Sequence, residues 1–374
     1  MFFDNASTTR VDDSIIEGIS MINNDFYYNP GGLYSSGRAS REYIDSCRKL
    51  VMKKLGATNA SLIFTGSASE ANNLALFGAA RKNGRILVSM GEHPSIYNTA
   101  LELKNRGYLV DFIKLGVDGC VDFDDFKAKM TKDVSLVSIM HVSNETGAIN
   151  DIENLVRFAR SVNNDVVFHC DGVQAVGKIG VDIDDLGVDM YTISAHKIHG
   201  LKGIGALIVS KNITLKPIVF GGGQEMGFRS GTENIVGIYS LAEAVRIACD
   251  NIDENYSNVS ALRKSFLDRM VEVGLDYKIN SNENGSPYII SISFPGVRAE
   301  TLLNMLDDNG FSIGNGSACS SKHSGNRILE AMGNGKRIVE SNVRISFSKY
   351  NNNTEVLMLV DCIGKCVRKY LINI

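Results

Sequence analysis

The sequence predicts an α/β protein with a large domain built on a mainly parallel sheet and a smaller α+β domain after it. Three observations support this prediction. Between residues 62 and 209, short apolar runs alternate with helical stretches, which is typical of strands joined by crossover helices. After about residue 255, the pattern changes to a long amphipathic helix followed by strands and helices in mixed order. The length of 374 residues is more than a single small core usually supports.

The large domain is predicted to contain seven strands. Each is an apolar run of strand length, and together they cover residues 61–64, 85–89, 109–113, 136–140, 166–169, 190–193 and 206–209. Helices are expected where apolar positions recur on one face, at 71–81, 97–105 and 152–162. We place the large domain at 13–254, and we expect residues 1–12 and 255–374 to form the small domain.

The charge balance and the cysteines limit the class of protein. Lys and Arg number 39 against 42 Asp and Glu, and no basic stripe is present, so we expect no nucleic-acid partner. The sequence has no signal-peptide pattern and no apolar run of membrane-spanning length, so we expect a cytoplasmic protein without a membrane partner. The seven cysteines lack paired CxxC spacing, and we interpret Cys362 and Cys366 as packing residues on a helix.

Polar residues follow three of the predicted strands. Asn144 comes after strand 136–140, Asp171 and Gln174 come after strand 166–169, and Lys197 comes after strand 190–193. Ligands of open α/β sheets bind beyond the carboxyl ends of the strands. We therefore expect an amide, a carboxylate and an amine to converge at one site.

Lys197 follows an apolar strand and precedes a glycine-rich loop, a place where an amine is partly desolvated. A desolvated lysine has a lowered pKa and forms imines readily. Pyridoxal phosphate supplies the aldehyde for such an imine, and its ring nitrogen needs a buried carboxylate, a role that suits Asp171. The alternative is that Lys197 and Asp171 form a structural salt bridge, or that they are exposed.

A phosphate would need a binding site of its own. Residues 65–70 place small and hydroxyl side chains at a strand-to-helix junction, which suits an anion but also suits an ordinary helix cap. Residues 172–178 match the first seven positions of a nucleotide P-loop, but Ile179 stands where Ser or Thr must reach Mg²⁺. We reject the nucleotide site for that reason.

A second candidate feature is the loop of small residues at 314–321, which presents Cys319. A nucleophilic thiol must approach its substrate and then withdraw, and a loop permits that movement. The alternative is an inert loop thiol. His323 lies nearby in the sequence, either to assist this thiol or as an exposed residue without a role.

Together, these segments resemble the cysteine desulfurases of the pyridoxal-phosphate-dependent class V aminotransferase group, on the nitrogen-fixation and iron-sulfur-cluster branch. The matching motifs occur in the family's order along nearly the whole chain, at 4–9, 139–147, 194–197, 221–225 with 229–234, and 316–319. The resemblance implies the aspartate-aminotransferase-like fold, fold type I, and a homodimer.

The resemblance also implies roles for single residues. Lys197 would hold the cofactor as an imine, Asp171 would pair with the pyridine nitrogen, Gln174 would bond the phenolic oxygen, and His93 would stack on the ring and serve in proton transfer. The phosphate contacts would be Ala68, Ser69, Ser194, His196 and, reaching across from the partner subunit, Thr232. The substrate carboxylate would be held by Asn144, which also lies at the cofactor, and by Arg344.

The implied reaction converts L-cysteine to L-alanine. Lys197 would remove the Cα proton, and Cys319 would take the sulfur as a persulfide for a sulfur-acceptor or scaffold protein, in iron-sulfur cluster assembly or another pathway. Cys319 is a possible transient iron-sulfur ligand, and we expect no other metal site. The alternatives are a selenocysteine lyase, an aminotransferase for a small amino acid, and a degenerate member that binds partners without catalysis.

The chain departs from the family pattern at four places. Tyr34 stands where the family usually has a histidine, and the glycine of the phosphate loop is displaced at 66–69. The segment after Cys319 is about one residue shorter and lacks the usual proline, and we do not expect the longer tail that some relatives use to dock a scaffold protein. The identity of the sulfur acceptor is therefore not fixed by the sequence.

Overall fold

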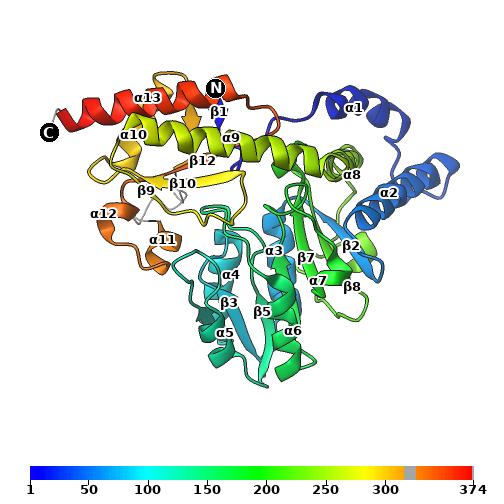
Figure 1. Ribbon diagram of the computed structural model, residues 1–374. Coiled ribbons are helices and arrows are strands. Elements are labelled where there is room, and N and C mark those ends of the chain that lie inside the picture. Colours follow the sequence, from blue (N-terminus) through cyan, green and yellow to red (C-terminus); the bar gives the residue numbers. More distant parts are fainter. Residues whose placement is uncertain (316–325, 373–374) are drawn as a thin grey trace.

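The computed structural model describes residues 1–315 and 326–372 of the protein. A seven-stranded sheet with helices on both faces forms one part, and a smaller three-stranded sheet under two long helices forms the other (Figure 1). In the described residues, no helix is long and apolar enough to cross a membrane.

The large sheet has the strand order β2-β8-β7-β6-β5-β3-β4. Only β8 runs antiparallel to its neighbours, so the predicted mainly parallel sheet is confirmed. The seven predicted strands are all present, as β2 (Ala60–Thr65), β3 (Arg85–Ser89), β4 (Leu109–Ile113), β5 (Val134–Ser138), β6 (Val167–Asp171), β7 (Met190–Ser194) and β8 (Gly205–Ser210).

One strand is shifted from its predicted position. Strand β5 starts two residues earlier than expected and ends at Ser138, whereas the prediction ran to Met140. The backbone amide of Met140 donates to Oε1 of Glu92 at 2.6 Å, so a side chain replaces the neighbouring strand as its acceptor. The pairing of β5 with β3 therefore ends at Ser138, while on the other side the amides of Ile139 and His141 still donate to the carbonyls of His169 and Asp171.

Both faces of the large sheet are buried. Along β3, Ile86 and Val88 face a cluster with α3 (Ala68–Ala79) and α4 (Pro94–Asn105), while Leu87 faces the opposite cluster. This alternation is the two-residue period of a strand. The opposite face is covered by α2 (Ser35–Lys54), α5 (Phe123–Lys129), α6 (Ile152–Val162), α7 (Ile183–Leu186) and α8 (Ile235–Asp250).

Five helices before residue 252 were not predicted from the sequence, namely α5, α7 and α8 on the sheet and two more at its edge. Helices α1 (Asp13–Asp25) and α2 lie at one side of the molecule, away from the small sheet (Figure 1). The apolar face of α1 is narrow, with only Ile15 and Ile22 buried, which explains why the pattern was not conspicuous.

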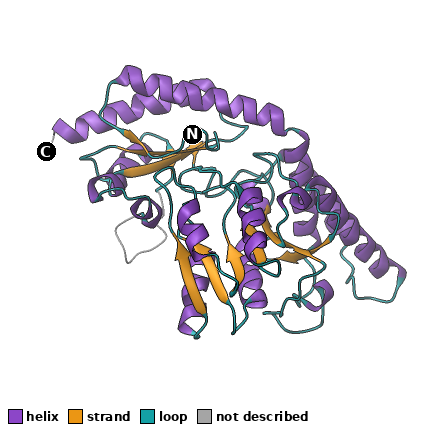
Figure 2. Cartoon of the chain, turned by 60° about the horizontal axis from the view of Figure 1, so that its bottom comes forward, coloured by secondary structure: helices purple, strands orange, loops and turns teal. Residues whose placement is uncertain are grey.

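The smaller part has a core of its own around Phe266, Phe294 and Phe347. Its two longest helices, α9 (Ile252–Val273) and α13 (Asn353–Ile372), lie side by side across the sheet β12-β10-β9 (Figure 2). The remaining elements are β9 (Lys278–Ile279), β10 (Ile289–Ser293), α10 (Ala299–Asp307), β11 (Ser312–Ile313), α11 (Arg327–Ala331), α12 (Lys336–Val339) and β12 (Asn342–Ser346).

Residues from the beginning of the chain join this smaller part. Strand β1 (Phe2–Phe3) pairs in parallel with β11, and Phe3 and Ala6 belong to the core around Phe266. Helices α8 and α9 are separated only by Asn251, so the chain passes between the two parts without a linker. The domain boundaries given above stay a prediction.

The described cysteines are all thiols. Cys362 and Cys366 both lie on α13, with 4.0 Å between their Sγ atoms. Both belong to or pack against the core of the smaller part, so they are packing residues as expected.

Candidate active site

A cavity of about 1440 Å³ opens at the carboxyl ends of the central strands and reaches the smaller part of the molecule. Asp4, Ala6 and Ser7 from the beginning of the chain contribute to its wall. It brings together nine of the residues predicted for the site, namely Ala68, Ser69, His93, Asn144, Asp171, Gln174, His196, Lys197 and Arg344.

Asp171 is the last residue of β6 and is almost fully buried. Its Oδ1 accepts from the backbone amide of Val173 at 3.0 Å, and its Oδ2 accepts from Nδ2 of Asn72 at 2.9 Å. The carboxylate is thus held at a fixed position facing the cavity. The sequence analysis missed Asn72, whose only signal was its place on α3 one turn after Ser69.

Lys197 ends the short helix η1 (Ala195–Lys197), directly after β7. Its Nζ donates to the carbonyl oxygens of Ala6 at 2.8 Å and Ser7 at 2.6 Å. Burial, assisted by the positive charge of Arg344, lowers the pKa of Lys197 to about 8. In the described residues Lys197 forms no ion pair with Asp171, so the salt-bridge alternative is wrong.

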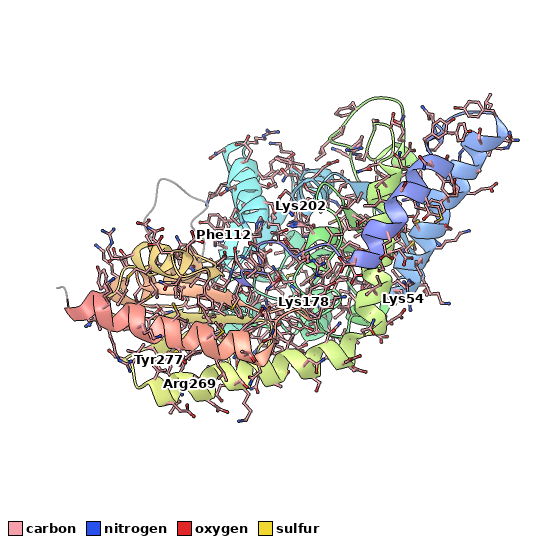
Figure 3. The ribbon with its side chains drawn as sticks, turned by 90° about the horizontal axis from the view of Figure 1, so that it is seen from above. Lys54, Phe112, Lys178, Lys202, Arg269 and Tyr277 are labelled. Carbon is pink, nitrogen blue, oxygen red and sulfur yellow. The ribbon has the colours of Figure 1, made fainter. Side chains whose placement is uncertain are left out.

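Gln174 connects the site to a second buried lysine. Its Nε2 donates to the carbonyl of Ala6 at 2.9 Å, and its Oε1 accepts from Nζ of Lys178. Burial lowers the pKa of Lys178 to about 7, and Figure 3 shows this residue in the middle of the molecule. The segment that resembled a P-loop therefore directs its lysine to a glutamine.

The start of α3 forms the part of the cavity that was predicted for an anion. Ser67 caps the helix, since its Oγ accepts from the backbone amide of Glu70 at 3.2 Å. A Cβ atom on Gly205 would lie 2.7 Å from the backbone nitrogen of Ala68, so a glycine is needed for this close approach. The helix-cap and anion interpretations are compatible, because free amides of the first turn still face outward.

Two further predicted contacts lie beside this helix end. The Oγ atom of Ser194 is buried and has no hydrogen-bond partner in residues 1–315 and 326–372. Nδ1 of His196 lies 3.2 Å from Oγ1 of Thr8, and burial lowers the pKa of His196 to about 4. Thr232 is exposed on the surface and does not line the cavity within this chain.

Arg344 lies on β12 and is held between two carboxylates. Its Nη2 donates to Oδ1 of Asp4 at 2.8 Å, and its Nη1 lies 3.3 Å from Oε1 of Glu145. Nη1 also donates to the carbonyl of Asn144 at 2.9 Å, and Nδ2 of Asn144 donates to Glu145 at 2.8 Å. The sequence analysis assigned no role to Asp4 or Glu145, because acidic partners so distant in sequence leave no local pattern.

Cys319 and His323 lie outside the described residues. Asn315 and Arg327, on either side of the segment 316–325, both line the cavity. Arg327 also donates to the carbonyls of Met90 and Glu92.

The sequence model for class-V aminotransferases matches residues 1–359. The chain belongs to this family. It is 32% identical to the cysteine desulfurase IscS of Dictyoglomus turgidum over 375 residues, which is 99% of this chain and 95% of that protein. It therefore groups with the cysteine desulfurases of the family.

Solved structures lead to the same family. A NifS-like protein superposes with a TM-score of 0.92 at 31% identity and covers 99% of both chains. A structure described as SspA in complex with cysteine superposes with a TM-score of 0.81 at 28% identity, over 94% of this chain and 99% of that one. These similarities confirm the aspartate-aminotransferase-like fold expected for a cysteine desulfurase.

Proposed function

We propose that the protein uses pyridoxal phosphate to remove sulfur from L-cysteine, releases L-alanine and holds the sulfur as a persulfide on Cys319. The observation that carries this proposal is the amine of Lys197. Its pKa is lowered to about 8, and it lines one cavity together with Asp171 and Arg344. An imine-forming group, an acid for a ring nitrogen and a cation for a carboxylate are thus within one site.

The residues present fit the cofactor. The buried hydroxyl of Ser194 has no partner in the described part of the chain. Ser194 ends β7 and pairs with Gly205 of β8, the glycine that lies against the start of α3. A phosphate on Ser194, Ser69 and the amides after Ser67 would satisfy these donors. When bound, pyridoxal phosphate supplies an electron-withdrawing ring that stabilises a negative charge at Cα.

Four residues of the chain would then act around that ring. Lys197 would hold the aldehyde carbon through Nζ, and after the substrate amine replaces it, the same Nζ would take the proton from Cα. Asp171 would keep the proton on the ring nitrogen, and Gln174 would donate to the phenolic oxygen. His93, which lines the cavity, would stack on the ring.

The substrate carboxylate would bind to Arg344. Its guanidinium already forms two ion pairs, so the substrate would join or replace Asp4 and Glu145. Asn144 lies beside it with a buried Oδ1 that has no hydrogen-bond partner in the described residues. An ordered carboxylate fixes the direction in which the substrate thiol points.

Sulfur transfer would fall to Cys319. Its thiolate attacks the substrate sulfur, the carbon–sulfur bond breaks, and the electron pair remains on the substrate Cβ. Protonation of that carbon and return of a proton from Nζ of Lys197 to Cα would give alanine, and the sulfur stays on Cys319 as a persulfide. A reductant or an acceptor protein then removes it.

The test is incubation of the purified protein with L-cysteine and a reductant. We expect sulfide and alanine in equal amounts, and we expect Cys319→Ala to abolish sulfide while the visible absorbance of the bound cofactor remains. Cys249→Ala, a change at a partly buried thiol on α8, is the matched control and retains activity. Alanine or a keto acid without sulfide would contradict the proposal.

The same assay separates the alternatives. An aminotransferase needs a keto acid and no thiol at 319, a selenocysteine lyase rejects L-cysteine, and a degenerate member turns over neither substrate. Ser194→Ala is expected to weaken the binding of pyridoxal phosphate about tenfold, the effect of one charge-assisted hydrogen bond. Fluorescence titration of the apoprotein measures this change.

We also propose a homodimer in which Thr232 of one subunit completes the partner's phosphate site. Large apolar side chains are exposed on α1, in the loop between α1 and α2 and in the loop before Thr232, where Leu33 is 88% and Phe220 is 81% exposed. A second copy would cover them. Sedimentation equilibrium should give twice the monomer mass, and Phe220→Asp should weaken the assembly.

The destination of the sulfur and the compartment are the remaining parts of the proposal. We propose a cytoplasmic enzyme, since a thiol that carries persulfide sulfur needs a reducing compartment. An iron-sulfur scaffold or another acceptor protein would receive the sulfur. Transfer of labelled sulfur from the protein to candidate acceptors tests this step.

A further inference from the structure

The ring of His93 is held on one side by two hydrogen-bond donors. His93 precedes α4, and the backbone amide of Ser95 donates to its Nδ1 at 3.1 Å, so the imidazole serves as the helix cap. The hydroxyl oxygen of Ser95 lies 2.8 Å from the same nitrogen. Nδ1 is therefore occupied by its contacts with Ser95 at the start of α4, while His93 also lines the cavity.

These contacts determine which ring nitrogen carries the proton. A backbone amide is only a donor, so Nδ1 must offer it a lone pair and cannot bear a hydrogen. In the neutral ring the hydrogen is then on Nε2. A second proton would have to enter at Nδ1, against the amide of Ser95 and the positive end of the α4 dipole.

The charged surroundings also favour the neutral ring. Burial lowers the pKa of His93, and the positive charges near it act in the same direction, while Asp171 opposes them. The charged groups that face His93 are Asp171, Lys197, Arg327 and Arg344.

The side chain of Ser95 connects His93 to the carboxylate of Asp171. Nδ2 of Asn72 donates one hydrogen to Oγ of Ser95 at 2.9 Å and the other to Oδ2 of Asp171 at 2.9 Å. The opposite amide orientation would place the Asn72 oxygen against the carboxylate, so this orientation is fixed. Oγ of Ser95 accepts from Asn72 and is left to donate its own hydrogen to His93.

We propose that Asn72 and Ser95 hold His93 in its Nε2–H form, so that His93 donates a hydrogen bond into the cavity and does not accept the substrate proton. This inference rests on the proposed function, since it assigns the Cα proton to Lys197 alone. The Cα–H bond breaks and the proton passes to Nζ of Lys197, while His93 stays neutral throughout. Asn72 and Ser95 are positioning residues.

Nitrogen-15 spectra of histidine-labelled protein test the assignment without turnover. We expect the His93 signals, identified by their loss in His93→Gln, to show an unprotonated Nδ1 and a protonated Nε2 in both the apoprotein and the protein with bound pyridoxal phosphate, from pH 6 to 9. A proton on Nδ1, or a doubly protonated ring near pH 7, would overturn the proposal.

Two variants test the positioning residues. Ser95→Ala removes one of the two donors, so the Nδ1 signal should move toward that of an uncontacted nitrogen. Asn72→Leu should produce a smaller move in the same direction, because the Ser95 hydroxyl is a weaker donor without its own hydrogen bond. An unchanged Nδ1 signal in Asn72→Leu would show that no link runs through Ser95.

Turnover distinguishes a donor from a proton acceptor. A glutamine at 93 keeps an N–H group near the position of Nε2 but does not titrate. We expect His93→Gln to retain sulfide release within about tenfold of the parent, and His93→Ala to lose about a hundredfold. Equal losses in both variants would restore the role of proton acceptor. If the parent protein releases no sulfide, the proposed function fails, while the nitrogen spectra still decide the tautomer.

Discussion

Two buried lysines lie near each other at the end of the large sheet, and they are held in different ways. Lys197 donates to the carbonyls of Ala6 and Ser7 and lines the large cavity. Lys178 donates to Oε1 of Gln174 and does not line that cavity. Burial lowers the pKa of both amines, to about 8 and about 7, and each repels the other as well as Arg344.

The comparison shows that a lowered pKa does not by itself make a reactive amine. Lys178 has the lower pKa, yet it is largely buried and its hydrogen bond orients an amide. Lys197 has carbonyl partners that a small movement of the side chain can release, and it faces open space. Access to the cavity therefore decides which of the two does chemistry, while the other orients Gln174.

The strongest test of this difference is Lys197→Ala. We expect sulfide release to fall by about a thousandfold or more, because both the imine and the proton transfer are lost. Lys211→Ala, at an exposed position after β8, is the control and should keep full activity. A substantial residual rate in Lys197→Ala would show that Lys178 reaches the substrate, and the comparison would fail.

The second test separates charge from geometry at Arg344. Arg344→Lys keeps the positive charge near both amines but loses the planar fork that grips a carboxylate. We expect KM for L-cysteine to rise about tenfold to a hundredfold with little change in kcat. Arg337→Lys on α12 is the matched control. A loss confined to kcat would argue against a substrate-carboxylate site.

The third test measures how the stability of the protein depends on pH when Lys178 is replaced. Its pKa is about 10.5 in the unfolded chain and about 7 in the folded protein, so the unfolded state binds more protons between these values. Burying this amine is therefore least costly at high pH. We expect Lys178→Met to raise Tm at pH 7 by several degrees and the gain to shrink as pH approaches 10, by calorimetry. The same substitution at exposed Lys365 should leave Tm nearly constant, and a gain that grew with pH would contradict this account.

The smallest effect is expected from Asp4→Asn. The negative charge of Asp4 raises the pKa of Lys197 and opposes burial. Without that charge, the pKa should fall below about 8, by less than one unit. The rate at which the apoprotein takes up pyridoxal phosphate should then reach its half-maximum at a lower pH. Asp13→Asn, an exposed change on α1, should leave the profile in place, and a shift to higher pH in Asp4→Asn would be opposite to the expected sign.

One part of the site could be predicted from the pattern of strands in the sequence. Asp171 and Lys197 follow apolar runs, and parallel strands bring their carboxyl ends to one edge, so their convergence follows from the sequence. The contact of Asn72 with Asp171 spans 99 residues, and that of Asp4 with Arg344 spans 340. Such pairs depend on how elements pack, and no local period encodes them.

The sequence contained signals for some of the contacts that the prediction missed. Gln174 and Lys178 are four residues apart, the spacing at which side chains of one turn meet. His93-Pro94-Ser95 is a helix start by its proline, which would have directed attention to what caps α4. Tyr34, the departure from the family pattern, is exposed with its ring 6.3 Å from that of Tyr28, and it does not line the cavity within this chain.

Lys197 is held by residues that are synthesised before it and, through them, by a residue that is synthesised after it. Its acceptors, Ala6 and Ser7, are made before it, but Ala6 is itself anchored by the hydroxyl of Ser346, which is made long after it. A growing chain on the ribosome therefore carries the lysine long before it carries the frame that seats it. Such a chain can fold its large sheet early and yet stay inert toward free cysteine until Ser346 has been made.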